Sequence, residues 1–230
     1  MHTLKQAKTL LLSTAIPLTF GLVPFTHAEP LTAEDYTKAK NLGEANTRSL
    51  HPTTSRVIKV SKHRSNVMTH NEKWMDVYRY HYPTDTTERI IYDVVNDKVV
   101  DSKQYKNIQF SATRDEIAYA KQLLTNNPAF MDKLSAEYYD RYHHSLPIQA
   151  PLSGLNIKAI VLTSDNPHSI PLVANTKNCG LNRCIYFFFT SLDAPYEYVA
   201  LETKAIVNLS KHTITPFRHK SEVSDHTDHH

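Results

Sequence analysis

Short runs in which apolar side chains alternate with polar ones recur along the chain and predict antiparallel strands. These runs are rich in β-branched and aromatic residues, as strands are. The predicted strands cover residues 56–62, 76–82, 89–95, 157–163, 184–190 and 196–209. Asn96-Asp97 predicts a two-residue hairpin turn that leads into a short run at residues 99–100. The run from Phe187 to Phe189 is apolar on both faces, which predicts a central strand or one that a partner covers.

Apolar residues at helical spacing predict one helix before the first group of strands and two before the second. The helical stripes are Leu31, Ala39 and Leu42, then Ile117, Ala120, Leu123 and Leu124, then Phe130, Leu134, Tyr138 and Tyr142. Thr32 and Ser111 are the predicted N-caps of the first two helices, and Gly43 is the predicted end of the first. Residues 126–128 (NNP) separate the second helix from the third, because the residue before a proline avoids helical geometry.

The two groups of elements resemble each other in sequence. Residues 74–100 return in altered form as residues 183–214, with Tyr78 opposite Tyr186 in the alignment and residues 91–94 (IYDV) opposite residues 206–209 (IVNL). A helix followed by antiparallel strands, present twice, predicts a duplicated α+β protein. We therefore predict two tandem units, residues 29–107 and 108–217.

Tyr78, Tyr80 and Tyr82 alternate along one predicted strand and so share one face. The prediction is a core face whose hydroxyl groups reach the rim, and the alternative is a groove that binds a ligand.

The first 28 residues have the pattern of a signal peptide. Lys5 and Lys8 precede an apolar stretch at residues 9–25, and residues 26–28 (THA) offer small side chains for cleavage. Two prolines interrupt the stretch, so we predict cleavage and no membrane span in the mature chain. The mature protein is then expected in the periplasm or outside the cell. Residues 218–230 are polar and His-rich, and we expect them to be disordered.

The charge of the chain is nearly balanced. Its formal net charge of +3 includes two lysines and no acid from residues 1–28, so the mature chain carries +3 − 2 = +1. This balance argues against a nucleic-acid partner. The expected partner is another protein or a second copy of the chain.

Cys179 and Cys184 are the two cysteines of the sequence. In an oxidising compartment, two thiols five positions apart across a Gly-containing turn are expected to form a disulfide. The spacing differs from the Cys-x-x-Cys redox motif, and two cysteines do not complete a thiolate zinc site.

No motif of a known catalytic class is present, so we predict no catalytic residue and no enzymatic activity. Histidine is the over-used chemical type. His226, His229 and His230, with acidic residues between them, suggest an alternative hypothesis in which the tail binds copper or zinc. Otherwise no cofactor is expected.

Several segments resemble the N-terminal domains of copper amine oxidases. Residues 31–34 (LTAE), Tyr78 and residues 91–94 (IYDV) are similar to the second N-terminal domain of that family. Residues 116–134 and 183–214 resemble its third N-terminal domain. The resemblance implies cystatin-like α+β folds for both units.

In that family the catalytic domain is a separate β-sandwich. It carries copper on three histidines and a quinone made from a tyrosine in an Asn-Tyr-Asp/Glu motif. This sequence has no Asn-Tyr pair, so the resemblance transfers no catalytic residue. The favoured hypothesis is an exported, non-enzymatic binding or assembly module. The alternatives are a periplasmic copper- or zinc-binding protein and an accessory or remnant subunit of a copper amine oxidase.

Overall fold

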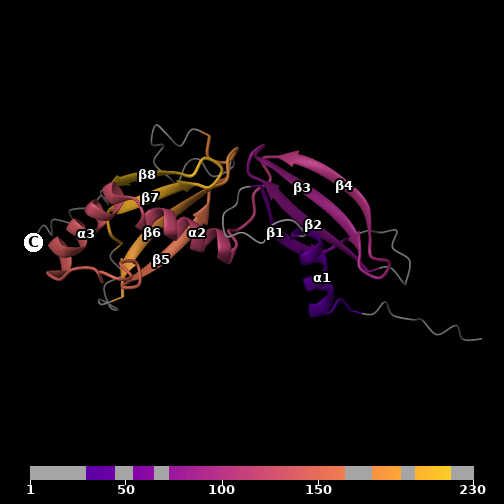
Figure 1. Ribbon diagram of the computed structural model, residues 1–230, viewed down its shortest axis with the longest axis horizontal. Helices are drawn as coiled ribbons and strands as arrows, with labels where there is room; N and C mark the ends of the chain where they lie inside the picture. The colour runs from indigo at the N-terminus through magenta and orange to yellow at the C-terminus, as the bar shows by residue number, and fades with distance from the viewer. Residues whose placement is uncertain (1–29, 45–53, 65–72, 164–177, 193–199, 219–230) are drawn as a thin grey trace, which may run out of the picture.

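The computed structural model describes residues 30–44, 54–64, 73–163, 178–192 and 200–218. The described chain forms two four-stranded antiparallel sheets, in the orders β1-β2-β3-β4 and β5-β6-β7-β8. Figure 1 shows the two sheets side by side, with one helix below the first and two helices over the second. This arrangement agrees with the predicted α+β class and with two tandem units. No helix in the described ranges is long and apolar enough to cross a membrane.

The first unit packs one helix on one face of its sheet. Its elements are α1 (Ala33–Glu44), β1 (Ser55–Lys62), β2 (Trp74–His81), β3 (Thr86–Asp93) and β4 (Lys98–Lys106). Thr32 begins α1 as predicted, because its hydroxyl accepts from the backbone N–H of Asp35 at 3.2 Å. Gly43 lies inside α1 and does not end it. A Cβ at Gly43 would come within 2.3 Å of Val57 Cγ2, so the missing side chain lets the helix approach the sheet.

The second unit packs two helices on one face of its sheet (Figure 1). Its elements are α2 (Arg114–Thr125), α3 (Pro128–Tyr142), β5 (Leu155–Val161), β6 (Cys184–Ser191), β7 (Thr203–Asn208) and β8 (Thr213–Arg218). Thr113 caps α2 in a reciprocal capping box with Glu116, so the prediction of Ser111 as the cap is wrong. Asn127 caps α3 with Pro128 in its first turn, as the predicted break at 126–128 requires.

Two strand predictions need correction. The β3–β4 turn contains the four residues 94–97, since Asp93 pairs with Lys98, and the Asp93 carboxylate accepts from the backbone N–H groups of Val95 and Asn96. The strand after this turn extends to Lys106 and far exceeds the predicted residues 99–100. The long strand predicted at 196–209 is formed over 203–208, and residues 193–199 lie outside the described ranges. β6 is a central strand, as its apolar character predicted.

The strand registers revise the alignment of the two units. Asp76 pairs with Ile91 in the first sheet, and Tyr186 pairs with Ile206 in the second. If Ile91 and Ile206 correspond, then Tyr186 corresponds to Asp76, two residues before Tyr78. The shift of two preserves the face of the strand.

A shared core joins the two units. Ile58, Tyr80 and Tyr82 of the first sheet belong to the same buried cluster as the helices and β6 of the second unit. A separate cluster, Ala39, Val57, Met75, Val77, Ile90, Tyr92 and Val94, lies between α1 and the first sheet. Thus one face of the first sheet packs against α1, and part of the other face packs against the second unit.

Candidate functional site

A buried arginine lies at the centre of the contact between the units. Arg183, just before β6, is fully buried, and each of its five guanidinium N–H groups has a hydrogen-bond acceptor. Nε and Nη2 donate to the two carboxylate oxygens of Glu116 at 2.9 and 3.0 Å. Nη1 donates to the side chain of Gln109 and to the carbonyl of Phe110, and Nη2 also donates to the carbonyl of Ser111. Arg183 therefore fixes the linker between the units, residues 107–113.

Glu116 connects this arginine to the first unit. The hydroxyl of Tyr82 donates to Glu116 Oε1 at 2.8 Å. Burial alone would raise the pKa of Glu116, but hydrogen bonds and the charge of Arg183 hold that pKa below its usual value. Burial and the neighbouring Glu116 carboxylate raise the pKa of Tyr82. The group is an ion pair with satisfied hydrogen bonds, which indicates a structural role.

A second set of contacts fastens the β2–β3 turn of the first unit to the second unit. The Asp85 carboxylate accepts from Tyr80 at 2.8 Å, from Asn182 Nδ2 at 2.5 Å and from Ser210 Oγ at 2.5 Å. Asn182 lies in the loop closed by the predicted disulfide, Cys179–Cys184, which the structure confirms. Tyr80 and Tyr82 are thus core residues as predicted, and Tyr78 packs partly buried against the same core, but the Tyr82 hydroxyl is bonded inside the protein and does not reach the rim. We call Tyr80, Tyr82, Asp85, Glu116, Asn182, Arg183 and Ser210 the inter-unit joint.

The outer strands of the two sheets differ in how open they are to another strand. An outer strand offers unpaired backbone groups unless a bulge, a proline or charged side chains discourage pairing. β1 has a bulge at Ile58, and β4 has one at Val100. β8 contains Pro216, which lacks an N–H group.

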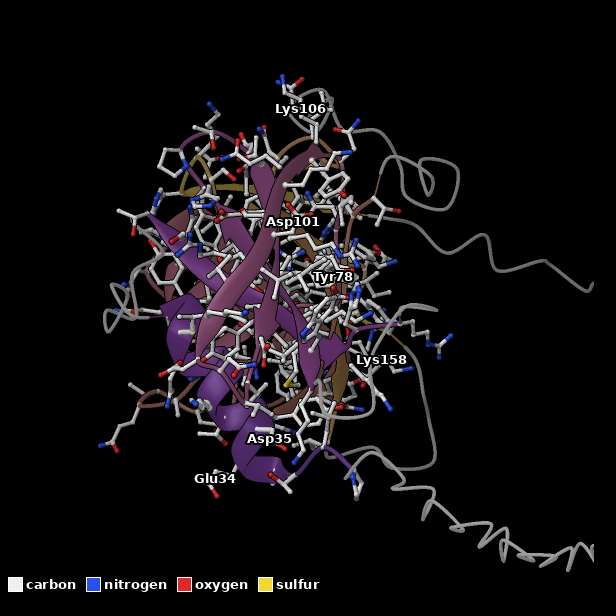
Figure 2. All side chains as sticks on the ribbon, turned by 90° about the vertical axis from the view of Figure 1, so that its right-hand side faces the viewer. Glu34, Asp35, Tyr78, Asp101, Lys106 and Lys158 are labelled. Carbon is white, nitrogen blue, oxygen red and sulfur yellow. A yellow bond between two sulfur atoms is a disulfide. The ribbon has the colours of Figure 1, made fainter. Side chains whose placement is uncertain are left out.

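Lysines reinforce this protection on β4. Lys98, Lys103 and Lys106 are exposed on that strand. Figure 2 shows β4 toward the viewer, with Asp101 and Lys106 along it. Three of the four outer strands therefore carry a bulge or a proline, which interrupt the backbone ladder itself, whereas β5 carries only one charged residue, Lys158.

β5 carries neither bulge nor proline. Its seven residues pair with β6 in unbroken register, and in the described part of the chain no strand pairs with its other side. The N–H of Leu162 donates to the carbonyl of Cys184, so Leu162 and Cys184 are a hydrogen-bonded pair of the β5–β6 ladder. Because such pairs alternate in an antiparallel ladder, the backbone groups of Ile157, Ala159 and Val161 point to the open side.

A groove lies beside this open strand. It has a volume of about 530 Å³ and runs between β5, the start of α2 and the linker. Its lining residues are Gln109, Phe110, Ser111, Ala112, Ile117, Ala159, Ile160, Val161 and Thr163. Phe110, Ile117 and Val161 are partly buried apolar side chains on the margin of the shared core. We call this space the β5 groove.

A smaller groove lies on the other side of the linker. Its volume is about 330 Å³, and it follows β1 and α1. Lys40 and Lys59 line it together with Thr113. The ammonium of Lys59 lies 4.4 Å from the ring centre of Phe110, the residue that lines the β5 groove. We call this space the β1 groove.

The metal-binding hypothesis concerns the C-terminal tail. His226, His229 and His230 lie outside the described residues. Within the described ranges, no group of three or more His, Cys, Asp or Glu side chains has the arrangement of a metal site. Binding of copper or zinc by the tail stays a prediction.

Sequence reasoning missed both the joint and the β5 groove. The signal that could have found Glu116 is its position three residues after Thr113, which is the spacing of a capping box. No local pattern marks Arg183, whose acceptors are contributed by residues more than 60 positions away. The regular alternation of β5 was visible, but its position at the edge of a sheet was not.

No family model matches the sequence, and no curated protein matches it. Among solved structures, the chain is similar to a copper-containing benzylamine oxidase from Hansenula polymorpha. The TM-score is 0.52 and the sequence identity is 11%, over 84% of this chain. The match spans 30% of the length of that oxidase. At this identity the similarity shows the fold alone, and the fold is one found within a copper amine oxidase.

Proposed function

We propose that this chain is an exported, non-enzymatic binding module that accepts an extended strand of another protein at the open side of β5. The observation that supports this proposal is a contrast between the outer strands. β5 has neither a bulge nor a proline, whereas β1, β4 and β8 each have one or the other. An added strand would bond to the backbone of Ile157, Ala159 and Val161 and place alternate side chains in the β5 groove.

The joint supports this function by giving the groove a fixed shape. Phe110 and Ser111, which line the β5 groove, are held through their carbonyls by Arg183 at 2.7 and 3.2 Å. Their positions are thus set before a ligand arrives, which lowers the entropic cost of binding.

The buried charges support a binding role over catalysis. Glu116 and Arg183 face each other, as do Asp76 and His63 at 2.9 Å. Neither pair lines the β5 groove or the β1 groove. The disulfide supports export, because such bonds persist in oxidising compartments.

Amide hydrogen exchange tests the strand-addition proposal. The probes are twelve-residue peptides that alternate valine with serine, glutamate or lysine. We expect at least one probe to slow exchange at Ile157, Ala159 and Val161 in the purified protein. Failure of all three probes to protect β5, or protection confined to another strand, would overturn the proposal.

One substitution provides a matched control. Ala159→Pro removes an outward N–H group without removing a bond between β5 and β6, and should abolish protection. Ala159→Ser keeps the N–H group and should bind normally. Equal binding by the two variants would contradict strand addition.

A second candidate rests on the similarity to a segment of a benzylamine oxidase. In this candidate the units correspond to the second and third N-terminal domains of that family and act as an accessory part beside a separate catalytic chain. The purified protein alone, supplied with copper and benzylamine, should consume no oxygen. Oxygen uptake would contradict both candidates.

A further inference from the structure

The charges around the β5 groove point to the chemistry of its ligand. We propose that the strand accepted at β5 carries apolar side chains on the face turned to the groove and carboxylates on the opposite face. This inference rests on the proposed function and specifies its partner.

Lys158 is the charged residue of β5 and is exposed on the face away from the helices. Its ammonium lies 5.6 Å from the ring centre of Phe188, its neighbour on β6. A strand added to β5 would place a side chain beside Lys158 on the side opposite Phe188. Opposite charges at such a cross-strand position attract, and like charges repel.

The side chains that line the two grooves include cations and no acid. The residues that line the two grooves include Lys40 and Lys59 and no Asp or Glu. The two carboxylates at the start of α2 are already engaged. Asp115 pairs with Arg56 at 2.7 Å, and Glu116 pairs with Arg183. No carboxylate that lines either groove is thus left to repel an acidic strand.

The positive charges extend beyond β5 itself. Lys59 lies across the linker from the β5 groove, above the ring of Phe110. Lys59 is also the partner of Tyr78 in the β1–β2 register. Lys59 is therefore a second cation close to the lining of the β5 groove.

A second copy of the chain fits this surface less well. The seven residues of β5, LNIKAIV, include no acid, so self-pairing would bring Lys158 toward its own copy without a neutralising charge. The expected occupant is a foreign strand with alternating apolar and acidic residues.

Binding of the three alternating peptides distinguishes these possibilities. We expect the valine–glutamate peptide to bind up to about fivefold more tightly than the valine–serine peptide, as one exposed charge pair of up to about 1 kcal/mol would give. The valine–lysine peptide should bind most weakly. Raising the salt concentration should reduce the preference, because exposed charges are screened.

Reversal of one charge is the decisive test. Lys158→Glu should make the valine–lysine peptide the tightest ligand, and Lys158→Ser should reduce the preference between charges. Lys133→Glu changes an exposed lysine of α3 and should leave the order unchanged. Fluorescence anisotropy of labelled peptides measures all three variants.

The outcomes separate the two proposals. If the three peptides protect β5 with equal affinity, or if Lys158→Glu leaves the order unchanged, the acidic partner is excluded and strand addition stands. If none of the peptides protects β5, strand addition itself is excluded. If two copies of the chain associate through β5 more tightly than any of the peptides binds, the occupant of β5 is a second copy and not a foreign strand.

Discussion

Arg183 and Glu116 are 67 residues apart in the sequence, yet their side chains form an ion pair at 2.9 Å with no solvent exposure. Such a pair stabilises a fold when its remaining hydrogen-bonding groups are satisfied, and removing one partner leaves a buried charge. The joint therefore makes the first unit, the linker and the second unit depend on one another.

Glu116→Gln should lower the free energy of unfolding by about 3–5 kcal/mol, because Arg183 keeps its charge without its counter-charge. Urea unfolding followed by circular dichroism measures the loss. Lys40→Gln, which breaks an exposed ion pair with Glu44, is the control and should cost less than about 1 kcal/mol. Equal effects of the two changes would contradict the structural role of Glu116.

Arg183→Lys should not restore the joint. Lysine has three donors at one nitrogen, whereas five N–H groups of Arg183 are engaged across a planar group. We expect a loss of unfolding free energy close to that of Arg183→Met. A lysine variant as stable as the unchanged protein would show that charge alone suffices.

Tyr82→Phe removes the hydroxyl that donates to Glu116 and should cost about 1.5–3 kcal/mol, the range for a hydrogen bond to a charged group. Tyr36→Phe alters a tyrosine that is 39% exposed and serves as the control. Thermal unfolding of both variants checks the difference. A smaller loss for Tyr82→Phe than for Tyr36→Phe would argue against the hydrogen bond.

Replacing both Cys179 and Cys184 by alanine should cost about 2 kcal/mol, because the loop that the disulfide closes is short. The unfolding transition should move to lower urea concentration. Addition of a reductant to the unchanged protein should reproduce the effect, and the double variant should be insensitive to the reductant. A reductant effect in the variant would point to another cause.

Glu88 should make stability depend on acidic pH. Burial acts to raise its pKa, but hydrogen bonds from Ser102, Arg79 and His81 lower that pKa from 4.5 to about 2. The unfolded chain takes up the proton first as the pH falls. The contribution of Glu88 is therefore complete above pH 4.5 and is lost between pH 4.5 and about 2.

Unfolding free energies measured at pH 6, 4.5 and 3 check this dependence. Glu88→Gln should be less stable than the unchanged protein at pH 6, and the difference should shrink toward pH 3. A difference that grows as the pH falls would have the wrong sign for a lowered pKa.

Local patterns in the sequence predict those elements whose cause is local. The break at Pro128 and the stripe of Phe130, Leu134 and Tyr138 appear in the structure because backbone geometry and amphipathic spacing determine them. The run at residues 56–62 has apolar Val57 and Ile58 side by side, which interrupts the alternation, and the structure has a bulge at Ile58.

Elements that depend on distant partners were beyond such patterns. β4 is exposed on both faces, so it lacks the alternation that reveals a strand, and its pairing with β3 alone defines it. Arg183 acquires its role from a linker and a helix that precede it by more than 60 residues. The open side of β5 follows from the order of strands in the sheet, which no local run encodes.

Pro216 and the two bulges have a consequence for stoichiometry. A sheet whose two edge strands can both pair with another copy leaves a free edge after each addition, and such chains polymerise without limit. Here the edge across from β5 is β8, whose Pro216 opposes pairing, so β5 of one copy is not expected to join β8 of the next in an open-ended series.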